Sequence, residues 1–195
     1  MSKRKVTIRC FLAVDLPGET KEVLAGLQRE LRAAGADVRW VRPEGFHLTL
    51  KFFGSIPEGK LEELVKAAER AASGLRPFVL SLKGAGFFPP RGTPRVVWVG
   101  LSGDLDPLLE LHRRLERAFE RVGFPPERRP FHPHLTLGRV KTPRGAEELR
   151  RRTANLRIPE HAFRVERLTF FRSELRPDGA VYTALREVAL RGEGE

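Results

Sequence analysis

The tetrapeptide His-Leu-Thr-Leu occurs twice in this chain, at residues 47–50 and again at residues 134–137. Each copy is followed by a turn-like stretch and then by the tripeptide Glu-Glu-Leu, so the repetition extends beyond the motif itself. This predicts two structurally related halves. Because side chains alternate between the two faces of a β-strand, each copy would direct its histidine and threonine to one face and its leucines to the other.

The paired motifs favour a catalytic site built from His47, Thr49, His134 and Thr136. A reaction that needs a general acid and a general base needs two groups that titrate near neutrality, and histidine does so unaided. A threonine hydroxyl can donate a hydrogen bond to an anionic oxygen. A single His-x-Thr strand would be unremarkable, since threonine is a good strand former and histidine is tolerated there. Two copies at corresponding points of a repeat are a stronger signal.

The charge balance indicates a polyanionic partner. The 195 residues include 36 Lys and Arg against 25 Asp and Glu, a net charge of +11 with a sequence pI near 10.7. RNA or DNA is the natural partner for such a chain. Abundant charges with only two amides, Gln28 and Asn155, are also typical of a surface adapted to heat. That alternative explains many charges of both signs but not the positive excess.

Hydropathy and cysteine content exclude several classes of protein. No apolar run approaches 18 residues, and the basic start at residues 1–5 leads into a strand without a secretory cleavage site, so we expect a cytoplasmic protein. The single cysteine, Cys10, excludes an internal disulfide and should be a buried thiol in an apolar strand. Without a cysteine cluster or an Asp-rich loop, the sequence predicts no metal and no cofactor.

The hydrophobic periodicity predicts the order β-α-β-α-β in each half, with additional strands at the end. Strands are expected at residues 6–14, 37–41, 46–53, 78–82, 95–101, in the second motif, at 163–174 and, after a turn at 176–179, at 180–190. Helices are expected at residues 18–34, 58–73, 106–122 and 146–156. The Gly- and Pro-rich residues 84–94 should form a packed loop.

These elements predict an α+β fold in a single bilobal domain, residues 1–195, with a first half of about 1–83 and a second of about 95–195. The two lobes would be related by a pseudo-twofold axis. Each would be an antiparallel sheet with helices on its outer face, and a central groove would bring the two His-x-Thr faces together.

Longer stretches around the motifs carry a family resemblance, and they are residues 11–17, 47–54, 95–98, 131–139 and 182–185. They resemble the 2H phosphoesterase superfamily, and most closely the RNA 2′,3′-cyclic phosphodiesterases, also called 2′-5′ RNA ligases. The resemblance implies opening of RNA 2′,3′-cyclic phosphate ends to 2′-phosphomonoesters without metal. It implies His47 as proton donor, His134 as proton acceptor and Arg139 as a further phosphate-binding residue, beside Thr49 and Thr136 on the non-bridging oxygens.

Strand parity argues against a phosphate-binding role for Arg139. Arg139 lies five residues after His134, so a regular strand would present it on the opposite face. Parity places His132 on the same face as His134, although a structural role is expected for it. We expect Phe52 in the core, and His112 and His161 at the surface.

Two further interpretations of function stay open. The same site could use a 5′-hydroxyl RNA in place of water, which would give 2′-5′ ligation. Alternatively, the protein could be a non-catalytic basic RNA-binding protein that grips phosphate with the same residues, although lysine or arginine would serve binding alone better. We expect a monomer.

Overall fold

The computed structural model describes residues 6–177 and 179–192. The basic residues 1–5 and Asp178 of the expected turn lie outside this described part. Its α-helices are α1 (Gly18–Arg32), α2 (Leu61–Ala72), α3 (Leu105–Glu120) and α4 (Ala146–Ala154). Its strands are β1 (Thr7–Asp15), β2 (Val38–Trp40), β3 (His47–Pro57), β4 (Phe78–Phe88), β5 (Val96–Gly103), β6 (His134–Val140), β7 (Ala162–Val165), β8 (Arg167–Arg176) and β9 (Gly179–Ala189).

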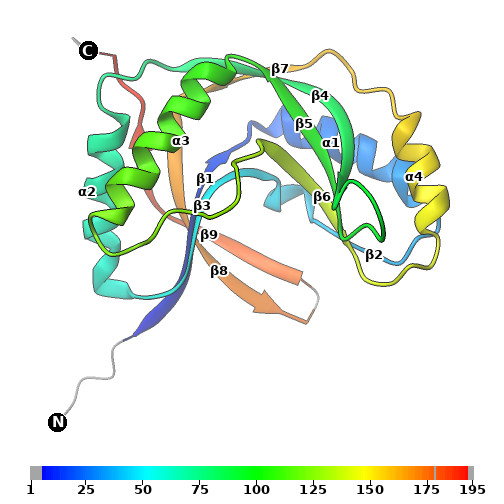
Figure 1. The fold of residues 1–195 in the computed structure, drawn as a ribbon, viewed down its shortest axis with the longest axis horizontal. Coiled ribbons are helices and arrows are strands. Elements are labelled where there is room, and N and C mark those ends of the chain that lie inside the picture. Colours follow the sequence, from blue (N-terminus) through cyan, green and yellow to red (C-terminus); the bar gives the residue numbers. More distant parts are fainter. Residues whose placement is uncertain (1–5, 178, 193–195) are drawn as a thin grey trace.

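The strands form two antiparallel sheets, which confirms the expected α+β class (Figure 1). One has the order β3-β1-β8-β9 and the other the order β2-β6-β5-β4-β7. Helix α2 lies beside α3, and α1 lies beside α4 (Figure 1). None of the helices in the described residues is long and apolar enough to cross a membrane.

The two sheets do not coincide with the two halves of the sequence. Strands β2 and β4 come from the first half but pair with strands of the second, while the β8–β9 hairpin joins β1 and β3. Periodicity predicts which residues are extended, but it carries no information about which strand edges pair. Each sheet therefore contains strands from both halves, and a boundary between residues 83 and 95 does not separate the sheets.

The core confirms the predicted faces of the two motifs. Leu48, Leu50, Leu135 and Leu137 are all buried in one large apolar cluster that also takes the apolar faces of the four helices. Cys10 lies in the same cluster, and burial raises the pKa of its thiol to about 12. The thiol is therefore protonated at neutral pH, as expected for an inert buried cysteine.

The predicted loop at residues 84–94 is wrong in its first half, because β4 continues to Phe88. A register shift between Leu82 and Ala85 marks a bulge, and Gly84 within it takes a φ of +67°. Glycine inside a strand often marks such a bulge rather than the end of the strand. The extension buries Phe87, which is 7% exposed, in the core.

Candidate active site

The two motif strands, β3 and β6, pack against each other at the junction of the two sheets. His47 and Thr49 pair with Asp15 and Ala13 of β1, so they share one face of the four-stranded sheet. His134 and Thr136 pair with Gly100 and Trp98 of β5, on one face of the five-stranded sheet. We call these two surfaces the histidine faces.

The histidine faces meet where β3 packs against β6, and charges on one face affect the titration of residues on the other. Burial lowers the pKa of His47, and the charge of His134 adds a small further lowering. Burial raises the pKa of Tyr182, and the charge of Arg139 opposes that rise. The structure therefore brings together the two histidines that the repeat predicted.

Both imidazole rings are held by the same local hydrogen bond. Nδ1 of His47 lies 2.7 Å from the carbonyl oxygen of Gly45, and Nδ1 of His134 lies 2.6 Å from that of His132. A carbonyl oxygen can only accept, so Nδ1 carries the hydrogen in each ring. Nε2 is then the nitrogen left to exchange a proton with a bound substrate, and the repeat supplies two such nitrogens.

Burial disfavours the protonated form of both histidines in the free protein. It lowers the pKa of His47 to about 4, with smaller lowering contributions from Lys21 and His134, while the bond to Gly45 and the charge of Asp15 oppose the shift. Burial also lowers the pKa of His134, assisted by the positive charge of Arg139. At pH 7 both rings are neutral, and each therefore starts as a base.

Arg139 lies on the histidine face, contrary to the parity argument. It pairs with Val96 of β5, and Gly138 pairs with Val97, but the next pair is Thr136 with Trp98. Leu137 is thus an extra residue in a β-bulge, which reverses the alternation beyond it. Because Val96 and Trp98 share a face of β5, Arg139 and Thr136 share a face of β6.

The first motif contains the same bulge. Thr49 pairs with Ala13 and Lys51 with Leu12, so Leu50 is the extra residue, and Phe52 then pairs with Phe11 on the histidine face. Phe52 therefore occupies in β3 the position that Arg139 occupies in β6, five residues after the histidine.

Phe52 is 43% exposed, so its predicted place in the core is wrong. The guanidinium carbon of Arg9 lies 4.7 Å from its ring centroid, and the ring of Phe11 lies 6.4 Å away in a stacked arrangement. The sequence predicts neither bulge, but because the two motifs are copies of one repeat, the bulge seen in β6 is matched by the one in β3.

Tyr182 of β9 was not predicted as a site residue, yet it lies on the histidine face of the four-stranded sheet. Its ring stands perpendicular to that of His47, with centroids 5.2 Å apart, and contacts Phe11 at 5.1 Å. Tyr182 pairs with Ser173 in the β8–β9 hairpin, so only the exchange of strands between the halves brings it to His47.

Arg39 was not predicted either. It pairs directly with Arg139 across β2 and β6, so the two side chains share the histidine face. Like charges directly opposite each other destabilise a sheet. A bound anion beside them would relieve that repulsion, and a phosphate is the anion suited to guanidinium groups.

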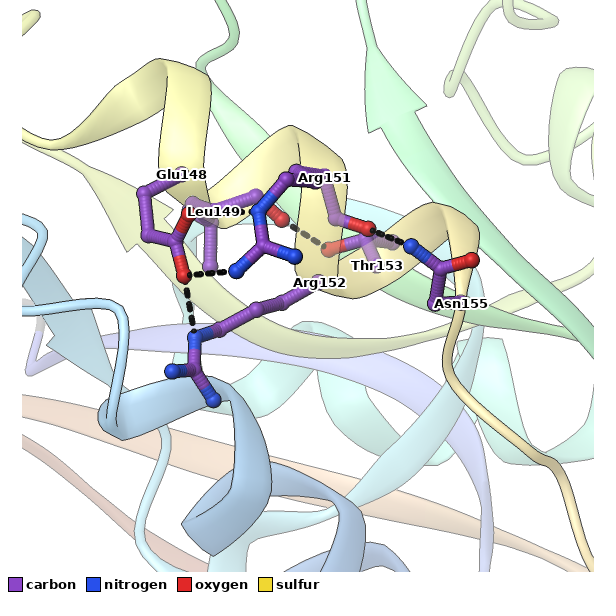
Figure 2. A network of polar contacts seen from close by, with 6 residues as sticks. All are labelled: Glu148, Leu149, Arg151, Arg152, Thr153 and Asn155. Atoms are coloured by element: carbon purple, nitrogen blue, oxygen red, sulfur yellow. Dashed lines mark hydrogen bonds and ion pairs between the residues drawn. The ribbon is translucent and has the colours of Figure 1, made fainter.

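Many other cations are neutralised within their own helices. On α4, Glu148 accepts hydrogen bonds from Arg151 and Arg152, and these bonds lower its pKa to about 2 (Figure 2). On the histidine faces the situation differs: within the described residues, Arg9, Arg39 and Arg139 form no ion pair with a carboxylate. Uncompensated positive charge is thus concentrated near the two histidines.

The remaining histidines lie apart from the pair or at its edge. His132 is exposed and borders a pocket beside His134. His112 and His161 are half-buried rather than at the surface: His112 stacks on Phe131 at 3.9 Å, and His161 hydrogen-bonds Thr20 at 2.9 Å. Across residues 6–177 and 179–192, no group of three His, Cys, Asp or Glu side chains is arranged to hold a metal ion.

Comparison with known proteins gives consistent matches over nearly the whole chain. Residues 20–177 match the model of the 2′-5′ RNA ligase superfamily. A protein of Methanothermobacter thermautotrophicus named RNA 2′,3′-cyclic phosphodiesterase is 41% identical over 177 residues, covering 90% of this chain and 95% of its own. A Thermotoga maritima protein of the same name is 33% identical, covering 95% and 97%.

Solved structures agree with these matches. A crystal structure of a Thermus thermophilus protein superposes with a TM-score of 0.79 at 34% identity, covering 95% of this chain and 100% of that one. Escherichia coli LigT in complex with 3′-AMP gives a TM-score of 0.74 at 29% identity, covering 95% and 99%.

Proposed function

Because this chain belongs to the 2′-5′ RNA ligase superfamily, we propose that it hydrolyses 2′,3′-cyclic phosphate ends of RNA to 2′-phosphomonoesters. Relatives that carry the name RNA 2′,3′-cyclic phosphodiesterase match it over nine-tenths of its length. The observation that carries the proposal is the pair of histidines on meeting faces, each anchored through Nδ1 and each left with Nε2 for proton transfer.

The proposed reaction uses one histidine at each end of an in-line displacement. Nε2 of His134 accepts a proton from water as its oxygen bonds to phosphorus, and His47 donates a proton to O3′ as the P–O3′ bond breaks. The hydroxyls of Thr49 and Thr136 donate to the non-bridging oxygens, and Arg139 adds a charge-assisted bond. The product is a 2′-phosphomonoester with a free 3′-hydroxyl.

Hydrolysis of adenosine 2′,3′-cyclic phosphate in EDTA tests the function. We expect turnover with 2′-AMP as the only nucleotide product, little change in His161→Gln, and loss of turnover in His47→Ala and in His134→Ala. Abolition by EDTA with recovery on adding a divalent ion would contradict the metal-independent reaction. Absence of turnover would favour the alternative, a non-catalytic RNA-binding protein.

A substrate with sulfur in place of O3′ tests the assignment of acid and base. A thiolate leaves readily without a proton, so sulfur should restore much of the rate of a variant that lacks the acid. We expect rescue of His47→Ala alone. Rescue of His134→Ala instead would reverse the two roles.

The same residues can catalyse 2′-5′ ligation, with a 5′-hydroxyl RNA as the nucleophile in place of water. We also propose that residues 1–195 act as one bilobal domain, because each sheet is built from both halves. A monomeric, cytoplasmic protein stays a prediction, and gel filtration with light scattering would test its oligomeric state.

A further inference from the structure

A pocket of about 380 Å³ lies beside His134 on the histidine face of the five-stranded sheet. This volume falls within the usual range for sites that bind small organic molecules. Its lining is aromatic and basic and consists of Lys83, Phe88, Trp98, Gly100, Leu101, His132, Pro133 and His134. The roles proposed above for His47, Thr49, Thr136 and Arg139 leave this pocket unused.

Two glycines shape the floor of the pocket around Trp98. A Cβ on Gly86, the direct partner of Trp98 on β4, would lie 2.6 Å from Cζ2 of the indole. A Cβ on Gly100 would lie 3.3 Å from Cζ3 and only 2.6 Å from the carbonyl oxygen of Lys83. With glycine at both positions the indole packs closely against the backbone of β4 and β5, and Trp98 lines the pocket.

Further rings complete the aromatic lining. Phe88 lies 5.2 Å from Trp98, with an interplanar angle of 35°, and its ring meets that of His134 at 4.8 Å and 84°. His132 lies 6.3 Å from Phe88. A planar base can stack on such a surface whatever its sequence, because every base has a π-face.

The position of the pocket decides which part of a substrate it can hold. In the proposed reaction the departing O3′ of the cyclic nucleotide lies on the side of His47, and the nucleophile enters on the side of His134. The pocket shares His134 with that entry side. The cyclic nucleotide has aromatic side chains on its own side, Phe11, Phe52 and Tyr182 on the other histidine face.

We propose that this pocket binds the nucleoside that supplies an attacking 5′-hydroxyl, with its base stacked on Trp98. The inference rests on the proposed function and assigns a second nucleoside position to that site. The 5′-oxygen bonds to phosphorus and gives its proton to His134, while the P–O3′ bond breaks and O3′ takes the proton of His47. The product is a 2′-5′ phosphodiester, and no other reactant is needed.

Charge at the rim favours an acceptor with a 3′-phosphate, as in an RNA strand. Lys83 is exposed at the edge of the pocket, and in the described part of the chain it forms no ion pair with a carboxylate. An RNA acceptor that places its first base on Trp98 carries its next phosphate on the 3′ side of that nucleoside. The ammonium group of Lys83 is suited to that phosphate.

The ratio of ligation product to hydrolysis product, formed when a nucleoside competes with water as the nucleophile, tests the proposal. Wild type acting on adenosine 2′,3′-cyclic phosphate with subsaturating adenosine should give 2′-5′ ApA and 2′-AMP in a measurable ratio. Trp98→Leu should lower that ratio about 5-fold to 100-fold, the effect of losing one stacked base. Hydrolysis without adenosine should change less than about threefold, as expected for a residue outside the proton transfers.

Two matched variants control for the loss of an indole from this sheet. Trp98→Phe keeps an aromatic surface and should keep most of the ratio. Trp40→Leu removes the indole of β2, which packs against the core, and should leave the ratio unchanged. An unchanged ratio in Trp98→Leu with intact hydrolysis would overturn the inference but not the proposed function.

Fluorescence tests the pocket without turnover and without altering it. The chain has two tryptophans, so a Trp40→Phe variant reports on Trp98 alone. Adenosine and adenosine 3′-phosphate should quench it, the latter more strongly, while saturating 2′-AMP should leave the quenching by adenosine in place. Loss of that quenching would mean that the pocket holds the nucleotide that carries the phosphate, which contradicts the proposal. If hydrolysis fails while adenosine still quenches, the proposed function fails and the site for a nucleoside stands.

Discussion

Binding of the phosphate should protonate His47, and the structure indicates how far its pKa must rise. Burial lowers the pKa of His47 from 6.5 to about 4, a difference worth about 3 kcal/mol against its charged form. A proton donor at pH 7 needs a pKa near 7 in the complex. The bound anion must therefore favour the charged imidazole by about three pKa units, or about 4 kcal/mol.

One close anion supplies that amount. Two opposite unit charges about 4 Å apart interact with about 4 kcal/mol at an effective dielectric constant of about 20. By linkage, the anion then binds the protonated protein about 10³-fold more tightly than the neutral protein. Affinity for the product 2′-AMP should rise as pH falls from 8 towards 5.

NMR titration of the imidazole protons, free and saturated with 2′-AMP, measures this directly. A His47→Gln variant assigns the resonance. We expect a pKa near 4 in the free protein and near 7 or above in the complex, with calorimetry in two buffers reporting uptake of close to one proton at pH 7. If His47 stays neutral in the complex while His134 takes up the proton, the reasoning is refuted and the roles are reversed.

Variants of the threonines, of His47 and of Arg39 test the rest of the site. Thr49→Ala and Thr136→Ala should each slow hydrolysis by at most about 10²–10³-fold, less than loss of either histidine, as measured by steady-state rates. The pKa of His47 in the folded protein is depressed, so its contribution to the free energy of unfolding is present above pH 6.5 and is lost as pH falls towards 4. Denaturant unfolding should show that wild type loses up to about 3 kcal/mol more of this free energy over that pH range than His47→Gln does. Arg39→Ala should reduce the slope of log affinity for single-stranded RNA against log salt by about one phosphate contact, whereas Arg151→Ala, whose charge is paired on α4, should leave it unchanged.

The repeat made the two histidines and two threonines predictable, because a strand has only two faces and leucine selects the buried one. The bulges were not predictable, because they place two consecutive residues inward and each depends on distant partners. In β3 the second inward residue is Lys51, which is buried with Glu116 of α3 at 3.0 Å and the carbonyl oxygen of Pro125 at 2.8 Å. Strand parity therefore failed at Phe52 and at Arg139 for one reason.

In β6 the second inward residue is Gly138, which has no side chain to accommodate in the core. A Cβ on Gly138 would lie 2.6 Å from a methyl group of Val38 and 2.9 Å from the indole of Trp40. Both of these side chains belong to β2, a strand from the other half of the sequence. The requirement for glycine becomes visible only once the exchange of strands between the sheets is known.

The residues around the motifs break a symmetry that the motifs themselves preserve. His47 and His134 sit in identical tetrapeptides and make identical Nδ1 hydrogen bonds, so nothing within the repeat distinguishes acid from base. Their charged neighbours differ: Asp15 raises the pKa of His47 and its ion-pair partner Lys21 lowers it, whereas Arg139 lowers that of His134 and, within the described residues, no carboxylate opposes it.

Arg139 reaches His134 only because of the bulge, and the matching bulge in β3 delivers uncharged Phe52 instead. A carboxylate beside one histidine favours its protonated form, and a guanidinium beside the other favours the neutral form. Burial is the largest effect on both rings and lowers the pKa of His47 to about 4, while a phosphate bound between the rings raises both pKa values, so these fixed neighbours are smaller contributions beside burial and the anion. They support His47 as the donor and His134 as the acceptor, and Asp15→Asn should accordingly lower the pKa of His47 in the 2′-AMP complex and shift the rate profile towards acid.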